Sequence, residues 1–154
     1  MARRQNLIVA GVPVGKEISD LQPLIHRDAE KEGSILVVIA TNAPLLPHQL
    51  KRLAKRAALG IARTGAVSTN SSGDLFLAFS TATPTAVGDR EQWSAVRNDD
   101  LDPLLSATVE ATEEAVINAL LAAETMRGAN DNTFFALPHD RLREILRKYN
   151  RLAE

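Results

Sequence analysis

The chain has 154 residues, of which 45% are hydrophobic and 24% charged, so it is long enough for one compact domain with a buried core and is not disordered. Its formal net charge is −1, from 18 basic and 19 acidic side chains, and this balance excludes an overall basic surface for nucleic acid or an anionic membrane. The absence of cysteine excludes disulfide frameworks, thiolate metal sites and cysteine nucleophiles.

The first half of the chain predicts two strands and a helix. Residues 7–12 are a short apolar run that predicts a strand, and residues 16–33 are polar and predict a loop. The β-branched run over 34–41 predicts a strand that is covered on both faces. Two prolines then lead into a predicted helix over 47–63, whose apolar stripe is Leu50, Leu53, Ala54, Ala57 and Ile61.

The second half predicts two more strands and two helices. A stretch of small residues, 66–73, leads into a second buried strand over 74–81, and residues 82–101 are irregular in pattern. Asp102-Pro103 marks a helix start, and the apolar periodicity carries this helix to residue 126. After a turn over 128–132 and a short strand over 133–137, a last helix begins at residue 138, with Leu142, Ile145, Leu146 and Tyr149 facing inward.

These elements predict an α/β fold that the chain does not complete by itself. A strand that is apolar on both faces has to be covered on both faces. Two or three strands with three helices cover a sheet poorly and leave an edge open. We therefore expect the chain to be part of a larger sheet, with the remaining strands supplied from elsewhere.

The sequence contains no pattern for a metal, a cofactor or a membrane span. His26, His48 and His139 have no partners at ligand spacing, and the glycines of residues 11–17 are spaced wrongly for a phosphate loop. No apolar run approaches the roughly 20 residues that cross a bilayer. We expect a soluble protein without cofactor, metal, nucleic acid or membrane as partner. Its compartment is open, with the cytoplasm favoured over the periplasm.

The dipeptide Gly33-Ser34 is the first candidate for chemistry, although Gly-Ser alone is a common loop dipeptide. It joins a charged segment, 27–32, to the start of a buried strand. If the bond between the two residues is cut, Ser34 becomes an amino terminus fixed on a rigid element. The pKa of an α-amino group is low enough for partial neutrality at working pH. A hydroxyl beside such an amine is a nucleophile with its own base, and Gly33 permits the backbone geometry of the cut.

The second candidate is the stretch 70–74, Asn-Ser-Ser-Gly-Asp, directly before the other buried strand. Ser72 and Asp74 are two residues apart, so on an extended backbone their side chains face the same side. A carboxylate that orients a hydroxyl, which in turn orients a nucleophile or its amine, follows the logic of a catalytic triad without histidine. The plain alternative is a serine–glycine turn before a strand.

Five segments of the chain carry a family resemblance: LIVAGVPVG (7–15), EGSILVVIAT (32–41), APLLPHQLKRLA (43–54), SSGDLFLAFST (71–81) and ALPHD (136–140). Together they resemble the DmpA-type aminopeptidase family, which contains the L-aminopeptidase/D-amidase-esterases and the β-peptidyl aminopeptidases. The resemblance covers essentially the whole chain. Asp74 stands where many relatives have glutamate, and Asn42 stands where an aspartate is usual.

This resemblance implies an autoprocessed serine aminopeptidase or amidase that releases amino-terminal residues from small peptides, amides or esters. It implies self-cleavage between Gly33 and Ser34, an acyl-enzyme on Ser34, and support from Ser72 and Asp74. Residues 1–33 would be the tail of the α-subunit part with its linker, and residues 34–154 the β subunit. The implied fold is α/β (α+β), part of a four-layer αββα sandwich of the amino-terminal-nucleophile-hydrolase type. A missing α-subunit segment would complete it, and several αβ units would form a homo-oligomer.

Two other interpretations stay open. A non-catalytic α/β binding or assembly module would use the basic residues between Lys51 and Arg63 for an anionic partner, and Gly33-Ser34 would then be an ordinary loop. An inactive remnant would keep the fold and lose the activity. A product that begins at Ser34 favours the hydrolase, whereas an uncut chain with salt-sensitive binding to polyanions favours the module.

Overall fold

The computed structural model describes residues 3–26 and 33–152, so the charged segment 27–32 that precedes Gly33 lies outside the described residues. The elements in chain order are the 3₁₀ helix η1 (Arg4–Asn6), helix α1 (Val14–Glu17), strand β1 (Leu36–Thr41), helix α2 (Pro47–Arg63), strands β2 (Leu75–Ser80), β3 (Thr85–Val87) and β4 (Arg90–Gln92), the 3₁₀ helix η2 (Asn98–Asp100), helix α3 (Asp102–Ala122), strand β5 (Met126–Arg127), the 3₁₀ helix η3 (Ala129–Asp131), strand β6 (Thr133–Phe134) and helix α4 (His139–Lys148).

Strands β1 and β2 form a parallel pair, with Leu36 opposite Leu75 at one end and Thr41 opposite Ser80 at the other. Because parallel strands need a crossover, the chain passes through α2 between them. Helix α2 begins at a proline, and the Gln49 side chain accepts a hydrogen bond from the Leu46 N–H at 2.9 Å before the first turn. The predicted strands over 34–41 and 74–81 and the helix over 47–63 are confirmed, with each strand two residues shorter than predicted.

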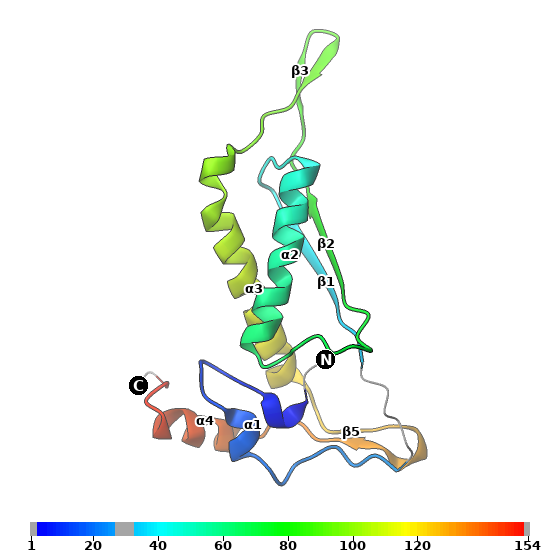
Figure 1. The fold of residues 1–154 in the computed structure, drawn as a ribbon, viewed down its shortest axis with the longest axis vertical. Coiled ribbons are helices and arrows are strands. Elements are labelled where there is room, and N and C mark those ends of the chain that lie inside the picture. The colour runs from blue at the N-terminus through cyan, green and yellow to red at the C-terminus, as the bar shows by residue number, and fades with distance from the viewer. Residues whose placement is uncertain (1–2, 27–32, 153–154) are drawn as a thin grey trace.

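Helices α2 and α3 lie side by side and cover one face of this sheet (Figure 1). Gly60 of α2 permits their close approach, because a Cβ atom there would lie 2.6 Å from the Val109 carbonyl oxygen of α3. Leu53 and Leu101 are almost fully buried in the cluster between the helices and the strands. Burial of each such side chain stabilises the fold by about 1.5–3 kcal/mol.

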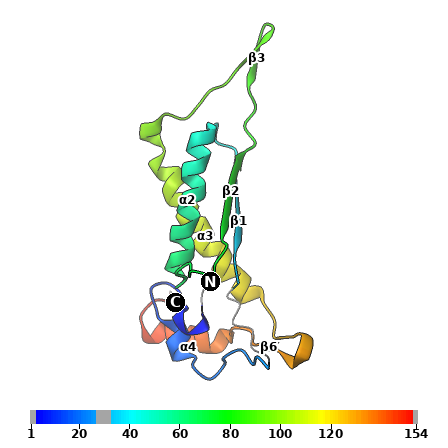
Figure 2. The same ribbon diagram turned by 45° about the vertical axis from the view of Figure 1, so that its right-hand side comes forward.

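The other face of the sheet is apolar and uncovered by any described residue, as Figure 2 shows from the side. The strands were predicted to be covered on both faces, and the residues that the structure describes cover only one. We call this surface the open face. Its large side chains are Leu36, Val38, Leu75, Leu77 and Phe79, which are 66%, 52%, 66%, 55% and 43% exposed.

The amino-terminal segment packs against α4 in a second apolar cluster. Val14 and Ile18 are 0% and 1% exposed there, against Leu142, Ile145 and Leu146 of the last helix. The predicted strand over 7–12 is wrong, because the backbone turns back on itself. Ala10 and Gly11 have positive φ, so Val9 pairs with Val12 in an isolated bridge. Tyr149, predicted to face inward, is 39% exposed.

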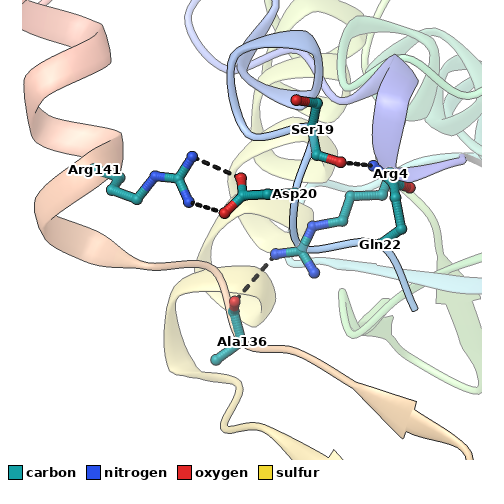
Figure 3. A network of polar contacts seen from close by, with 6 residues as sticks. All are labelled: Arg4, Ser19, Asp20, Gln22, Ala136 and Arg141. Carbon is teal, nitrogen blue, oxygen red and sulfur yellow. Dashed lines mark hydrogen bonds and ion pairs between the residues drawn. The ribbon is translucent and has the colours of Figure 1, made fainter. Parts of the chain in front are cut away.

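Polar contacts hold the amino-terminal segment to the carboxyl-terminal part of the chain (Figure 3). The Arg4 guanidinium donates to the carbonyl oxygens of Phe135 and Ala136 at 3.0 and 3.1 Å. Arg141 forms a bidentate ion pair with Asp20, with both N–O distances at 2.8 Å. The Tyr149 hydroxyl donates a hydrogen bond to the Glu17 carboxylate at 2.7 Å, and this contact explains why the ring points outward.

Three other details differ from the prediction. Residues 82–101 contain a hairpin of β3 and β4, which projects from the end of the sheet (Figure 1). Its strands are short and fully exposed, so no apolar alternation marks them in the sequence. Helix α3 ends at Ala122 rather than residue 126, because Ala123 is extended. Strand β6 has two residues, whereas the prediction extended over 133–137.

Candidate active site

The amino-terminal ends of β1 and β2 bring the predicted site residues together. Ser34 lies two residues before β1, and Ser72, Gly73 and Asp74 lie directly before β2. Because the strands are parallel and their first residues are opposite each other, both segments reach the same end of the sheet. Asn42 follows the other end of β1, away from this site.

The Asp74 carboxylate connects the two strands at this end. Its Oδ1 accepts hydrogen bonds from the Ser72 hydroxyl at 2.7 Å and from the Ile35 N–H at 3.0 Å. Its Oδ2 accepts a hydrogen bond from the Ser68 hydroxyl at 2.8 Å. Through the first two bonds, Asp74 holds the Ser72 hydroxyl and the backbone of Ile35, which is the residue next to Ser34.

The Ser34 hydroxyl lies on the other side of this connection. Its Oγ accepts a hydrogen bond from the Gly73 N–H at 2.8 Å, and the residue is exposed. A Cβ atom on residue 73 would lie 3.3 Å from this oxygen, which is tighter than an ordinary contact. The absence of a side chain at Gly73 therefore lets the backbone approach Ser34 closely. Gly33 is half-buried beside it.

Hydrogen bonding lowers the pKa of Asp74 below its ordinary value. The largest cause is the bond from the Ser72 hydroxyl, followed by the Ile35 N–H and the Ser68 hydroxyl, all of which favour the ionised form. Asp74 is therefore a carboxylate at neutral pH. It can accept hydrogen bonds and orient a hydroxyl, but it holds no proton to donate as a general acid.

The structure thus gathers Gly33, Ser34, Ser72 and Asp74, the four residues that the sequence singles out, at one end of the sheet. Two further groups at this site, the Ser68 hydroxyl and the Gly73 N–H, were not predicted from the sequence. Ser68 lies six residues before Asp74 in a stretch rich in small residues, and no spacing rule singles out its hydroxyl. A backbone N–H leaves no signal in a sequence.

The described residues form neither a metal site nor a membrane-spanning helix. No group of three or more histidine, aspartate or glutamate side chains there comes together as a metal site. None of the helices formed by the described residues is long and apolar enough to cross a membrane. The basic side chains between Lys51 and Arg63 lie on α2, where Arg63 forms an ion pair with Glu113 of α3 at 3.1 Å.

Comparison with known proteins gives matches over nearly the whole chain. The model of peptidase family S58 matches residues 1–134. The chain is 46% identical to the beta-peptidyl aminopeptidase BapA of Sphingosinicella microcystinivorans, over 96% of this chain and 41% of that protein. It therefore spans about two fifths of the length of this curated relative.

Solved structures give the same result. The chain matches the L-aminopeptidase D-Ala-esterase/amidase of Ochrobactrum anthropi with a TM-score of 0.82 and 44% identity, over 97% of this chain and 41% of that one. That protein is described as a prototype for the serine aminopeptidases and as a variant among the Ntn hydrolase fold. A beta-aminopeptidase from Burkholderia sp. matches with a TM-score of 0.79 and 38% identity, over 94% of this chain and 41% of that one. These similarities confirm the predicted family resemblance and fold class.

Proposed function

This chain belongs to peptidase family S58, and we propose that it carries the nucleophile of a self-processing serine aminopeptidase or amidase. The substrates would be small peptides, amides or esters with a free amino terminus. One observation carries the proposal: the Ser34 hydroxyl is fixed by the Gly73 N–H beside the hydrogen-bonded pair of Ser72 and Asp74. No described contact gives the binding-module alternative comparable support.

In the proposed maturation step, the Ser34 Oγ attacks the carbonyl carbon of Gly33. The C–N bond between the two residues breaks, and the acyl group moves from the Ser34 nitrogen to its oxygen. Water then hydrolyses this ester, so that Gly33 gains a carboxylate and Ser34 gains a free α-amine and recovers its hydroxyl. Gly33 suits this step because it has no side chain to oppose the strained geometry of attack.

In the proposed turnover, the neutral α-amine of Ser34 accepts the proton of its own hydroxyl as Oγ attacks the substrate carbonyl. The leaving amine or alcohol departs with a proton, and water hydrolyses the acyl-enzyme. Ser72, held at 2.7 Å by the Asp74 carboxylate, would orient the α-amine or stabilise developing charge beside it. All of these groups come from the described residues, and none of the steps requires a metal or cofactor.

We further propose that residues 1–33 are the tail of an α subunit and residues 34–154 the β subunit. The chain spans 41% and 39% of the length of its two curated relatives, and its open face is a large apolar surface. An exposed patch of this kind marks an interaction site. The remainder of the enzyme would supply the layer that covers Leu77 and Phe79, together with further parts of the substrate site.

The experiment that tests the function is the intact mass of the full-length protein after purification. We expect a fragment that begins at Ser34, and aminopeptidase activity that appears together with it. Ser34→Ala should leave the chain uncut and inactive. Ser94→Ala, in the exposed segment after β4, should be cut and active like the wild type. An uncut wild-type protein with full activity would contradict the mechanism.

A further inference from the structure

We propose that Ser68 is a positioning residue, which fixes the Asp74 carboxylate so that Asp74 can in turn hold Ser72 and the start of β1. The inference deepens the proposed function and rests on it. Ser68 lies outside the two sequence segments that carry the predicted chemistry, in the connection between α2 and β2. Its role follows from three features of the structure.

The first feature is the division of hydrogen bonds on the carboxylate. Oδ1 accepts both the Ser72 hydroxyl and the Ile35 N–H, whereas Oδ2 accepts the Ser68 hydroxyl at 2.8 Å. A carboxylate held at one oxygen only can rotate about its last side-chain torsion, which is broad and two-fold. The Ser68 hydroxyl removes this freedom, so Oδ1 stays aligned with both of its donors.

The second feature is the fold of the connection itself. The Ser72 N–H donates to the Thr69 carbonyl oxygen at 2.9 Å, which closes a turn over 69–72. Ser68 lies directly before this turn and Ser72 is its last residue, and both hydroxyls donate to the same carboxylate. The arrangement places a single group, Asp74, between the loop after α2 and the first residues of β1.

The third feature is the backbone of Ser68, which has a φ of +38°. Serine rarely adopts a positive φ, and such conformations persist where surrounding contacts determine them. Val67 beside it is 69% exposed, so apolar packing of that neighbour does not account for the conformation. The Ser68 side chain donates a hydrogen bond to Asp74 at 2.8 Å, a contact that favours this conformation.

Three variants of the full-length protein distinguish the effect of the Ser68 hydroxyl from the effect of its backbone conformation. Ser68→Ala removes the donor and keeps a Cβ atom at positive φ. Ser68→Gly removes the donor and suits the backbone. Ser68→Asn keeps a donor on a residue that tolerates positive φ. The matched control is Ser94→Ala, in the exposed segment that follows the hairpin at the far end of the sheet (Figure 1).

Each variant is assayed for the rate of self-cleavage and its pH dependence, for kcat and KM with an aminoacyl p-nitroanilide, and for its thermal midpoint. Ser68→Ala and Ser68→Gly should both lower kcat about tenfold and change KM less than about twofold, because they disturb the alignment of the Asp74 carboxylate rather than substrate binding. Loss of a donor to the ionised form raises the pKa of Asp74, so self-cleavage, which precedes the release of the Ser34 amine, should begin to fall at a higher pH than in the wild type. Asn should restore most of the rate.

The outcomes are distinct. If Ser68→Gly matches the wild type while Ser68→Ala does not, the backbone matters and the hydroxyl does not, which overturns the inference. Equal rates and unmoved pH profiles in both variants overturn it as well, as does a fall in rate that only follows a fall in the folded fraction. If the wild type itself is neither cut nor active, the proposed function has failed, and this inference fails with it.

Discussion

The hydroxyl of Ser34 and the backbone nitrogen of Gly73 lie 2.8 Å apart, although 39 residues separate them in the chain. The parallel pairing of β1 and β2 creates this contact, because it places the first residues of both strands at one end of the sheet. The nucleophile of the proposed enzyme is thus fixed by backbone from a neighbouring strand, and its position depends on residue 73 having no side chain.

Gly73→Ala should therefore slow self-cleavage without unfolding the chain. The added Cβ atom would lie 3.3 Å from the Ser34 Oγ, so the hydroxyl has to move by a few tenths of an ångström. Small misplacements of reacting groups are costly, and we expect self-cleavage to slow by about tenfold or more. The rate is measured from the appearance of the fragment that begins at Ser34. Gly128→Ala is the matched control, since its nearest neighbouring atom lies at 3.8 Å. Equal rates for both variants would show that Gly73 does not position the nucleophile.

Asp74 should make the site sensitive to acid. Its pKa is lowered chiefly by the Ser72 hydroxyl, with the Ile35 N–H and Ser68 adding to the effect. A carboxylate with a lowered pKa in the folded state contributes stability that is present above its ordinary pKa and is lost as the pH falls through the folded value. We therefore expect self-cleavage to persist below the pH at which an ordinary aspartate is protonated, and to fall only at more acidic pH.

Asp74→Asn should slow self-cleavage by about tenfold or more wherever the wild-type Asp74 is ionised, because the amide has one acceptor oxygen and no charge. Asp74→Glu keeps the carboxylate and should retain measurable cleavage, which makes it the matched control. The test is a pH series of cleavage rates for the three proteins. A wild-type profile that falls with the pKa of an ordinary aspartate would contradict the role of the three hydrogen bonds.

The sequence predicts the parts of this fold that long apolar patterns specify. Strands β1 and β2 and helix α2 emerge nearly at their observed bounds, because their burial follows simple periodicities. The sequence also singled out three site residues. Ser34 was chosen because it follows Gly33 at the start of a buried strand, and Ser72 and Asp74 because they are two residues apart before the other buried strand. The contact between Ser72 and Asp74 was expected from their spacing. The contacts of Ser34 with Gly73 and of Ile35 with Asp74 were not predicted, since they depend on strand pairing between residues 39 apart.

The failures have local causes. The apolar run over 7–12 fits a strand by composition, but positive φ at Ala10 and Gly11 folds it back into a turn. The hairpin of β3 and β4 leaves no apolar pattern because every residue of it is exposed. Tyr149 fits the apolar stripe of α4, yet its hydroxyl finds Glu17 outside the core, a tertiary contact that periodicity does not contain.

The open face should make the isolated 154-residue chain associate with itself. Leu77 and Phe79 are 55% and 43% exposed there, within a patch that only one layer of helices covers from behind. The double variant Leu77→Lys and Phe79→Glu keeps the net charge and should reduce this association, as measured by sedimentation. The matched control carries the same pair of charges at Lys51 and Glu110, exchanged as Lys51→Glu and Glu110→Lys on exposed helical positions. A wild-type chain that sediments as a monomer and unfolds cooperatively would contradict the need for a covering layer.

The segment before the cut should stay bound to the rest of the chain after the Gly33–Ser34 bond is broken. Its Leu24 N–H donates to the Thr133 carbonyl oxygen at 2.9 Å, and Ile18 is 1% exposed against the residues of α4. Hydrogen exchange of residues 3–26 should therefore be equally protected in the cut wild type and in uncut Ser34→Ala.

Ile18→Ala should raise exchange across this segment, because truncation of a buried isoleucine costs about 2–5 kcal/mol of packing. Arg143→Ala is the matched control, since the ion pair of Arg143 is made with Asp140 of its own helix at 3.4 Å. Its removal should leave the protection of residues 3–26 unchanged, as expected for an exposed ion pair worth less than about 1 kcal/mol. If cutting alone frees these amides in the wild type, the covalent bond, and not the packing of Ile18 and the pairing at Leu24, is what holds the segment in place.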